Sequence, residues 1–430
     1  MKQKALKTVA AVIAAIVMAS CDGDDNSVMT QTSTITIENV LDSKPLVQSG
    51  TFKGQTNPTI ASGESVSITF SASKNQRLTF ATMYGWSNDL FFAPANPGIK
   101  LYNDDGSPIT GDVSAQVKLW DNGTRVNAEP GMSLTHPGVA EAAAKNIEEV
   151  VGEDAYGNTY PAASEMVKLT LTYNNNSMFT LKIENTSGET DNETLLSPGV
   201  WAISYFAGNI LVPEPIYSPG KPTANGLTNL AESGDNAPMN TFLTGLTGIF
   251  TPLSPVLVVV YDGSENPYFK TGENDRNEGL KDIAQKGSAD ALASKLMTKA
   301  GVKAVYILKD PTTTVLLPKM GATAGSKVSQ QLTISSGDRI AVATMYGFSN
   351  DWFFSTSGND IDATQKGDVT SSIGLYDDGT AINQYPGAGI TQFNLAGTPL
   401  VESKPIQAVP NPNEFNTLPP VASMIKVTLE

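Results

Sequence analysis

The alternation of apolar and polar residues along the chain predicts β-strands. Residues 66–70 and 167–172 place an apolar side chain at every second position, as half-buried antiparallel strands do. Clusters of Gly, Asn and Asp interrupt such segments at short intervals and favour turns between them. We therefore predict an all-β protein built of antiparallel β-sandwiches.

This pattern occurs twice, which indicates an internal repeat. Residues 78–92 return as residues 340–354 with the shared core Ala-Thr-Met-Tyr-Gly-[Trp/Phe]-Ser-Asn-Asp. Further matched pairs are 111–113 with 367–369, 119–124 with 375–380, 166–171 with 424–429, and 35–39 with 181–185. Because beginnings, middles and ends all match, we place a boundary at the polar residues 174–176. The predicted domains are 34–173 and 178–430.

The second copy is longer because it contains a duplicated element. Residues 226–248 match residues 279–301 at a constant offset, and their apolar residues are three and four positions apart, which predicts short amphipathic helices. A strand-like segment precedes each of them, at 200–206 and 256–260. We expect the first domain to lack this element or to keep only a remnant of it at 45–53.

The start of the chain is typical of a secretory signal peptide. Three lysines precede the apolar residues 9–17, which are too few to span a bilayer permanently. Residues 18–21 then resemble the lipobox of bacterial lipoproteins and end at Cys21, the only cysteine of the chain. We predict a signal peptide at 1–20 and a lipid on Cys21. An ordinary signal peptide with an unrelated cysteine is the alternative.

The predicted mature chain is acidic. Removing residues 1–20 takes away three lysines, so the formal net charge changes from −15 to −18. This charge disfavours binding to nucleic acid and to anionic lipid headgroups, so the lipid on Cys21 is the only membrane contact that we expect. Residues 21–33 are acidic and polar, and we predict a solvated tether there. The expected location is the bacterial cell envelope, on its periplasmic side or at the cell surface.

Residue types that support common catalytic mechanisms are scarce. The one histidine, His136, cannot build a zinc site alone. The chain contains neither a Gly-x-Ser-x-Gly motif nor a Gly-x-x-x-x-Gly-Lys-[Ser/Thr] loop, which accompany an esterase nucleophile and a bound nucleotide. We predict that the protein is not an enzyme. A hydrolase that uses paired carboxylates is a less favoured alternative.

Three motifs stand out: Ser-Asn-Asp-[Leu/Trp]-Phe-Phe at 87–92 and 349–354, [Trp/Tyr]-Asp-x-Gly-Thr at 120–124 and 376–380, and Gly-Leu-x-x-Leu-Ala-Glu-x-Gly-Asp at 226–235. In combination they resemble the motifs of the spondin N-terminal domain family, in its bacterial form. The resemblance extends over most of residues 32–430. It implies tandem C2-like β-sandwiches. From the animal matrix members it also implies a bound calcium ion and a role in extracellular attachment.

Two aspartates in each copy are candidate calcium ligands: Asp89 with Asp121, and Asp351 with Asp377. Each lies beside Asn or Gly at the end of an apolar segment, and loops at one end of a sandwich gather in space, so we expect each pair to meet. The resemblance places metal ligands at these positions. It also implies an acidic residue four positions after the second aspartate, where this chain has Arg125 and Ala381 instead.

Two interpretations of these aspartates stay open. In one, Asn122, Asp378, Asn127 or Glu129 supplies the missing oxygen, because calcium accepts amide and carbonyl oxygens as well as carboxylates. In the other, the aspartates form turns by accepting hydrogen bonds from the neighbouring backbone.

Aromatic residues accompany both motifs, and most are expected in the core, as is usual for aromatic residues of strands. Trp86 and Phe348 lie between Gly and Ser-Asn. That loop context favours exposure and makes them candidate ligand-binding residues. We predict a binding or adhesion module for an extracellular glycan or protein, with calcium dependence if the aspartates hold the ion. A structural envelope protein without a specific ligand is the alternative.

Overall fold

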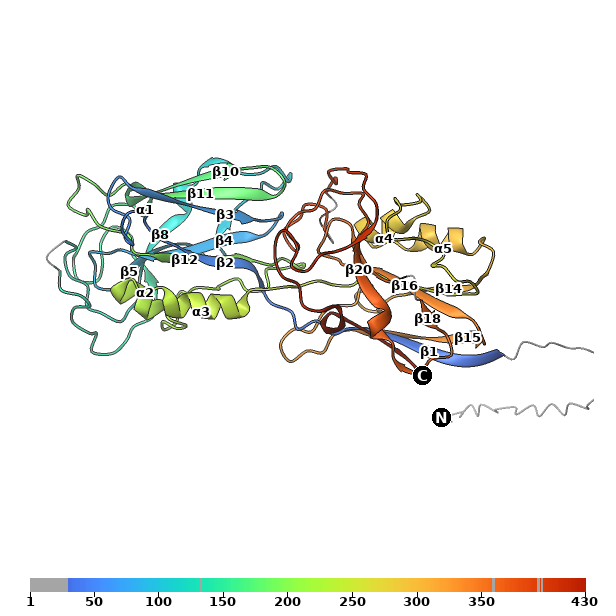
Figure 1. Ribbon diagram of the computed structural model, residues 1–430. Helices are drawn as coiled ribbons and strands as arrows, with labels where there is room; N and C mark the ends of the chain where they lie inside the picture. Colours follow the sequence, from blue (N-terminus) through green and yellow to red (C-terminus); the bar gives the residue numbers. More distant parts are fainter. Residues whose placement is uncertain (1–29, 132–133, 358–359, 393–394, 396) are drawn as a thin grey trace, which may run out of the picture.

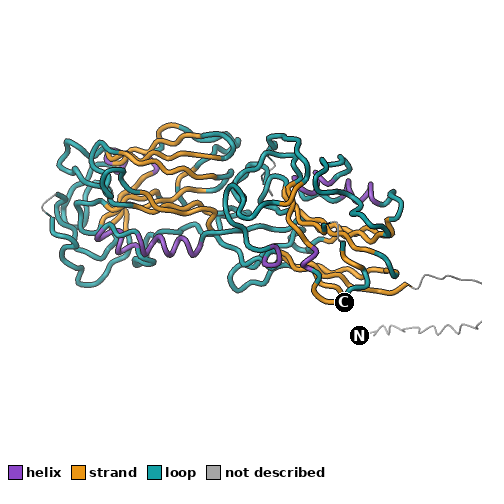
Figure 2. Tube along the Cα trace, in the orientation of Figure 1, coloured by secondary structure: helices purple, strands orange, loops and turns teal. Residues whose placement is uncertain are grey.

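The computed structural model describes residues 30–131, 134–357, 360–392, 395 and 397–430. These residues are mostly β-strand and loop, and the strands pair antiparallel in several sheets. The prediction of an all-β sandwich-type fold is confirmed. Two lobes lie end to end, each with strands in layers and short helices at one side (Figures 1 and 2).

One lobe, which we call the inserted lobe, spans residues 46–246. Its smaller sheet has the order β3 (Ser65–Ser71), β11 (Met178–Asn185), β10 (Val167–Tyr173), β7 (Gly111–Asp112). Its larger sheet has the order β2 (Leu46–Phe52), β12 (Gly199–Ser204), β4 (Arg77–Met83), β5 (Leu90–Pro94), β8 (Val117–Asp121), β9 (Glu148–Glu149), with β6 (Ile99–Lys100) paired to β4. The strands predicted at 66–70 and 167–172 are confirmed.

The other lobe, which we call the split lobe, combines residues 30–39 with residues 256–430. Its smaller sheet has the order β15 (Lys327–Ser335), β1 (Thr30–Asn39), β22 (Ile425–Leu429), β19 (Gly367–Asp368). Its larger sheet has the order β14 (Val302–Leu308), β13 (Val256–Tyr261), β16 (Arg339–Met345), β17 (Trp352–Thr356), β20 (Ile373–Asp377), β21 (Gln407–Ala408), with β18 (Ile361–Asp362) paired to β16.

The two lobes have the same strand order, and each strand of one has a counterpart in the other. By this correspondence β1 takes the place in the split lobe that β11 takes in the inserted lobe. The split lobe thus receives its first strand from the start of the chain and its other strands from beyond residue 255. The inserted lobe lies between these two parts in the sequence. In Figure 1, β1 (blue) accordingly lies beside the orange strand β15.

The predicted domain boundary at 174–176 is wrong. These residues form the turn of a hairpin, because β10 and β11 pair antiparallel along their lengths. Asn175, Asn176 and Ser177 have φ angles of 68°, 50° and 65°, a left-handed conformation that polar turn residues adopt more readily than others. Since β11 also pairs with β3, residues 178–246 belong to the inserted lobe. Residues 34–39 belong to the split lobe. Neither 34–173 nor 178–430 is therefore a structural unit.

Each lobe carries one helical element against its larger sheet. In the inserted lobe this element is α2 (Leu227–Ser233) with α3 (Ala237–Leu246), and in the split lobe it is α4 (Leu280–Lys286) with α5 (Asp290–Leu296). Their apolar residues form a core with the sheets that they cover. The helices predicted within 226–248 and 279–301 are confirmed, and the preceding strands are β12 and β13. The expectation that the first copy lacks the element is wrong. The remaining helical segments are α1 (Ala163–Met166), η1 (Ser114–Gln116), η2 (Thr370–Ser372) and η3 (Val421–Ser423).

Strand β1 is an inner strand of its sheet. It pairs with β15 on one side and with β22 on the other. At its end, the buried Asn39 donates from Nδ2 to the carbonyls of Thr251 (3.0 Å) and Leu316 (2.9 Å). Residues 30–33, which were predicted to belong to the tether, are the first residues of this strand. The signal peptide, Cys21 and the rest of the tether lie outside the described residues. In the part of the chain that is described, no helix is long and apolar enough to cross a membrane.

The lobes meet through opposite ends. We call the end of a lobe that contains residues 84–89 or 346–351 its motif end. The opposite end of the lobe, where β4 or β16 starts, is called its tail. Tyr205, at the tail of the inserted lobe, stacks on Phe348 at the motif end of the split lobe, with ring centroids 5.8 Å apart. Gln76 Nε2 donates to Gly387 O (2.7 Å). Phe348 is only 2% exposed, so the prediction that it is an exposed ligand-binding residue is wrong.

We expect Gly387→Ala to weaken this contact between the lobes. A Cβ at Gly387 would lie 2.4 Å from Tyr205 Cε1, and the φ of +93° disfavours any side chain. Overpacking of this kind costs about 1–3 kcal/mol, which thermal unfolding would detect as a lower melting temperature. Gly131→Ala is the matched control, because nothing among the described residues lies within 4 Å of the position of its Cβ. Equal melting temperatures for both variants would contradict the expectation.

Candidate functional site

The structure brings the predicted aspartates together in the inserted lobe. Asp89 immediately precedes β5 and Asp121 ends β8, and these neighbouring strands pair Leu90 with Asp121. Asp89 is fully buried. Its Oδ2 accepts hydrogen bonds from Thr124 N (2.7 Å), Thr124 Oγ1 (3.0 Å) and Arg125 N (2.8 Å). Asp121 accepts from Gly123 N (2.7 Å) and from the side chain of Asn127.

The split lobe repeats this arrangement. Asp351 is fully buried, and its Oδ2 accepts from Thr380 N (2.7 Å), Thr380 Oγ1 (3.1 Å) and Ala381 N (2.8 Å). Asp377 accepts from Gly379 N (2.8 Å) and from Asn383 Nδ2 (2.7 Å). Both oxygens of the second aspartate of each pair thus accept hydrogen bonds within the loop, as the interpretation as turn residues predicts.

The first aspartate of each pair keeps one oxygen without a partner. Asp89 Oδ1 and Asp351 Oδ1 are buried and have no hydrogen-bonding partner among the described residues. Side-chain oxygens of neighbouring residues share this property: those of Asn88, Asn122 and Asn127 in the inserted lobe, and those of Asn350, Asp378, Asp275 and Glu402 in the split lobe. Buried acceptors of this kind are rare, and a water or an ion is a common reason for them. Glu129, by contrast, is exposed.

Burial and mutual repulsion disfavour the charged forms of these carboxyls. Burial and then the charge of Asp121 raise the pKa of Asp89 to about 6. Burial and then Asp377 raise the pKa of Asp351 to about 7. Burial and then Asp275 raise the pKa of Asp378 to about 8. A cation held here would offset both effects.

The two lobes have different surroundings at Arg125 and Ala381, the positions where the resemblance implies an acidic ligand. Arg125 does not bond to either aspartate through its guanidinium group, which instead forms an ion pair with Glu232 of α2 (2.6 Å). Glu232 also accepts from Thr124 Oγ1 (2.7 Å). In the split lobe, Ala381 and Gln285 occupy the corresponding positions. The sequence reasoning missed Glu232, although the paired change of Arg to Ala and Glu to Gln between the copies was a visible signal.

The carboxylates alone do not form a metal centre. Over the described residues, no three His, Cys, Asp or Glu side chains gather as they would around a metal ion. Amide oxygens such as those of Asn88 and Asn122, which calcium accepts as ligands, would have to complete a site. The residues present thus fit calcium better than a metal that requires nitrogen or sulfur ligands.

Trp86 lies at the free motif end of the inserted lobe. It is partly exposed and lines a cavity of about 410 Å³ together with Met83, Leu134, His136 and Ser197, among others. Its neighbours in the motifs are buried, as expected for core aromatics: Phe91, Phe92, Trp120, Trp352, Phe353, Phe354 and Tyr376. Of the two predicted binding residues, only Trp86 is accessible to a ligand.

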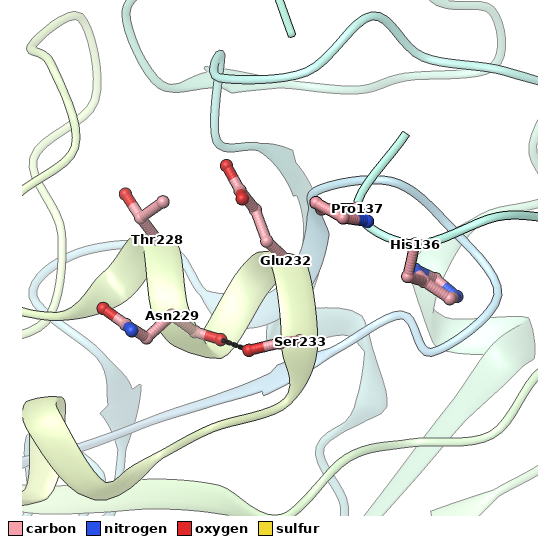
Figure 3. Close-up of a pocket in the computed structure, with 6 residues that line it drawn as sticks. All are labelled: His136, Pro137, Thr228, Asn229, Glu232 and Ser233. Carbon is pink, nitrogen blue, oxygen red and sulfur yellow. Dashed lines mark hydrogen bonds between the residues drawn. The ribbon is translucent and has the colours of Figure 1, made fainter. Parts of the chain in front are cut away.

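A second cavity of about 230 Å³ adjoins the first, because His136 and Ser233 line both. Figure 3 shows Thr228, Glu232 and Ser233 on α2 opposite Pro137 and His136 of the facing loop. The split lobe has a smaller cavity of about 170 Å³ at the corresponding place, lined by Ser254, Gly287 and Met345 among others. The cavity of about 410 Å³ beside Trp86 is therefore larger than its counterpart of about 170 Å³ in the split lobe.

No model of a protein family matches the sequence, and no curated protein matches it at a significant level.

Proposed function

We propose that the protein is a lipid-anchored binding module of the bacterial cell envelope and that its ligand binds around Trp86. The observation that carries this proposal is the difference between two equivalent ends. Phe348 is covered by the inserted lobe, whereas Trp86 is partly exposed beside two adjoining cavities.

The place at which the first described residues enter the split lobe supports a binding site at Trp86. Thr30 pairs with Ser335 at the tail of the split lobe, so a tether from Cys21 would arrive there. The split lobe contacts the inserted lobe through its motif end, and the motif end of the inserted lobe lies at the opposite extremity (Figure 1). A protein anchored through Cys21 would thus present Trp86 far from its own membrane, where an extracellular glycan or protein can be reached.

We further propose that calcium binds the aspartate clusters and that the split lobe binds it more tightly. Asp378 takes the place of Asn122 there, and Ala381 takes the place of Arg125. Arg125 pairs with Glu232, and both charges are absent from the split lobe, so the difference that favours a cation there is the additional carboxyl group of Asp378. The resemblance to spondin domains is consistent with such a site. A purely structural envelope protein is the alternative, and we propose no catalytic role.

We expect Trp86→Ala to weaken binding strongly without unfolding the protein. The side chain is partly exposed, and residues that anchor an interface commonly lose about 2 kcal/mol or more on truncation, a roughly thirtyfold weaker affinity. The measurement is binding of the labelled full chain to bacterial and host cells and to a glycan array, with Met297→Ala as the control. Met297 is 66% exposed and lies in the other lobe. Undiminished binding of the Trp86 variant would overturn the proposal.

A further inference from the structure

One loop of the split lobe connects its aspartates with the inserted lobe. It consists of residues 380–387, and we call it the joint loop. At its start, two backbone N–H groups donate to Asp351 Oδ2 (2.7 and 2.8 Å). Asn383 donates from Nδ2 to Asp377 Oδ2 (2.7 Å) and accepts at Oδ1 from Trp352 Nε1 (2.7 Å). The first half of the joint loop is therefore fixed by hydrogen bonds to the aspartates and their neighbours.

The second half of the joint loop is bonded to the inserted lobe. Asn176, in the turn between β10 and β11, donates from Nδ2 to Asn383 O (3.2 Å) and accepts at Oδ1 from Gln384 Nε2 (2.8 Å). Gln76, directly before β4, donates to Gly387 O (2.7 Å). Both glutamines are buried, which strengthens their hydrogen bonds because the surroundings are less polar than water. Asn383 thus contacts an aspartate through its side chain and the inserted lobe through its carbonyl.

The inserted lobe contains the same loop without a second lobe beyond it. Asn127 Nδ2 donates to Asp121 Oδ2 (2.8 Å), as Asn383 Nδ2 does to Asp377. All hydrogen bonds that the described residues make to this loop, residues 124–131, come from the inserted lobe itself. The bond between the loop and its aspartate is therefore common to both copies, whereas the bonds to another lobe are particular to the joint loop.

A bound cation and the contact between the lobes depend on the same residues. Binding of an ion restricts the groups that hold it, and contacts that already restrict these groups reduce the loss of freedom. Asn383 restricts Asp377, and Asn176 of the inserted lobe restricts Asn383. Asp351 Oδ1, which is buried and has no partner among the described residues, is free to bind the same ion. If the contact between the lobes favours the ion, the ion must strengthen that contact by the same factor.

We propose that calcium bound by Asp351 and Asp377 fastens the inserted lobe to the split lobe through the joint loop. This inference rests on the calcium site of the proposed function and adds the control of the contact between the lobes by the ion. With calcium bound, Asn383 and Gln384 are held in the positions that bond to Asn176. Without calcium, the two aspartates repel each other, the joint loop gains freedom, and the inserted lobe changes its direction relative to the split lobe more readily.

The test compares two glycine variants in one turn of the inserted lobe. Asn176→Gly removes both bonds to the joint loop, and glycine adopts the φ of 50° without strain. Asn175→Gly is the matched control, because Asn175 has a φ of 68° and an exposed side chain. Calorimetric titration of the full chain with calcium measures the affinity, and Asp351→Asn identifies the split-lobe site by its loss. We expect Asn176→Gly to weaken that site roughly twofold to tenfold, the range of one net hydrogen bond, and Asn175→Gly to leave it unchanged.

Hydrogen exchange provides a second readout at the turn of residues 174–177. Calcium should slow exchange there in the unchanged chain and not in Asn176→Gly, although the turn contains no aspartate. Equal calcium affinities of the two glycine variants overturn the inference, as does exchange at the turn that calcium leaves unaltered. If the unchanged chain binds no calcium at the site that includes Asp351, the calcium proposal itself fails and the inference fails with it. Calcium binding without the effects of Asn176→Gly refutes the inference alone.

Discussion

A fragment of residues 46–248 is expected to fold alone, whereas a fragment of residues 178–430 is expected to remain unfolded or to aggregate. The first contains every strand of both sheets of the inserted lobe together with α2 and α3. The second lacks β1, the inner strand between β15 and β22. It also contains residues 178–246 without the strands β2, β3, β4 and β10, with which β11 and β12 pair in the intact protein.

The free energies of apolar burial favour complete loss of the native structure in the fragment of residues 178–430. Apolar side chains of residues 178–246 that are fully buried in the intact protein include Leu181, Ile183, Val200, Leu230 and Leu243. Each contributes about 1.5–3 kcal/mol on burial, so their combined loss approaches the 5–15 kcal/mol that stabilises a typical domain. The split lobe additionally loses Ile35 and Ile37 of β1, both 0% exposed.

Circular dichroism and thermal unfolding of the two fragments provide the measurement. A third fragment, residues 249–430, isolates the effect of β1, because adding a peptide of residues 30–39 should restore cooperative unfolding. A Leu181→Ala variant of the 46–248 fragment is a useful control, since it should lower the melting temperature without abolishing the fold. Cooperative unfolding of the 178–430 fragment would contradict the split arrangement of the lobes.

The local structure was largely predictable from the sequence. Strands β3 and β10 follow the alternation of apolar residues, and the helical elements follow apolar residues at spacings of three and four. The meeting of Asp89 with Asp121 was also predictable, because each lies at the end of a strand and β5 pairs with β8. In each case the evidence lies within a short segment of the chain.

The assignment of strands to lobes was not predictable in the same way. Residues 35–39 and 181–185 have equivalent patterns, so either would fit either sheet. The tight turn at 175–177 decides the matter, since it pairs β11 with β10 and leaves β1 for the split lobe. The burial of Phe348 depends on Tyr205, which is distant in sequence. A motif repeated in both copies cannot show that only one of its aromatic residues is covered.

Asp378→Asn is expected to stabilise the calcium-free protein at neutral and alkaline pH. Asp378 is fully buried, and burial followed by repulsion from Asp275 raises its pKa to about 8. The ordinary pKa of an aspartate in an unfolded chain is about 3.9. The folded state therefore retains a proton that the unfolded state has lost between these values. Stability from this group is complete below about pH 4 and decreases as the pH rises through about 8.

The inserted lobe shows that the substitution is compatible with the fold. Asn122 occupies the corresponding position, and its Nδ2 donates to Thr124 Oγ1 (3.0 Å), while Asp378 Oδ2 accepts from Thr380 Oγ1 (3.0 Å). Since one pKa unit corresponds to about 1.4 kcal/mol, a shift of several units amounts to roughly 2–5 kcal/mol. The variant should therefore melt several degrees above the unchanged protein at pH 8 in chelator and close to it at pH 5.

Calcium should reverse this order if it binds the split-lobe cluster. An ion that binds only the folded state at a hundredfold excess over its Kd adds about 2.7 kcal/mol of stability, and the unchanged protein keeps the carboxylate that holds it. Melting temperatures from pH 5 to 8, in chelator and in millimolar calcium, test both halves of the prediction. The reciprocal variant Asn122→Asp should give the inserted lobe a similar dependence on pH.

If Asp378→Asn stabilises the protein in chelator and calcium has no effect on either form, the carboxyl is buried without a metal role. If the pH dependence is unchanged, Asp378 does not titrate in this range and the account of the cluster fails.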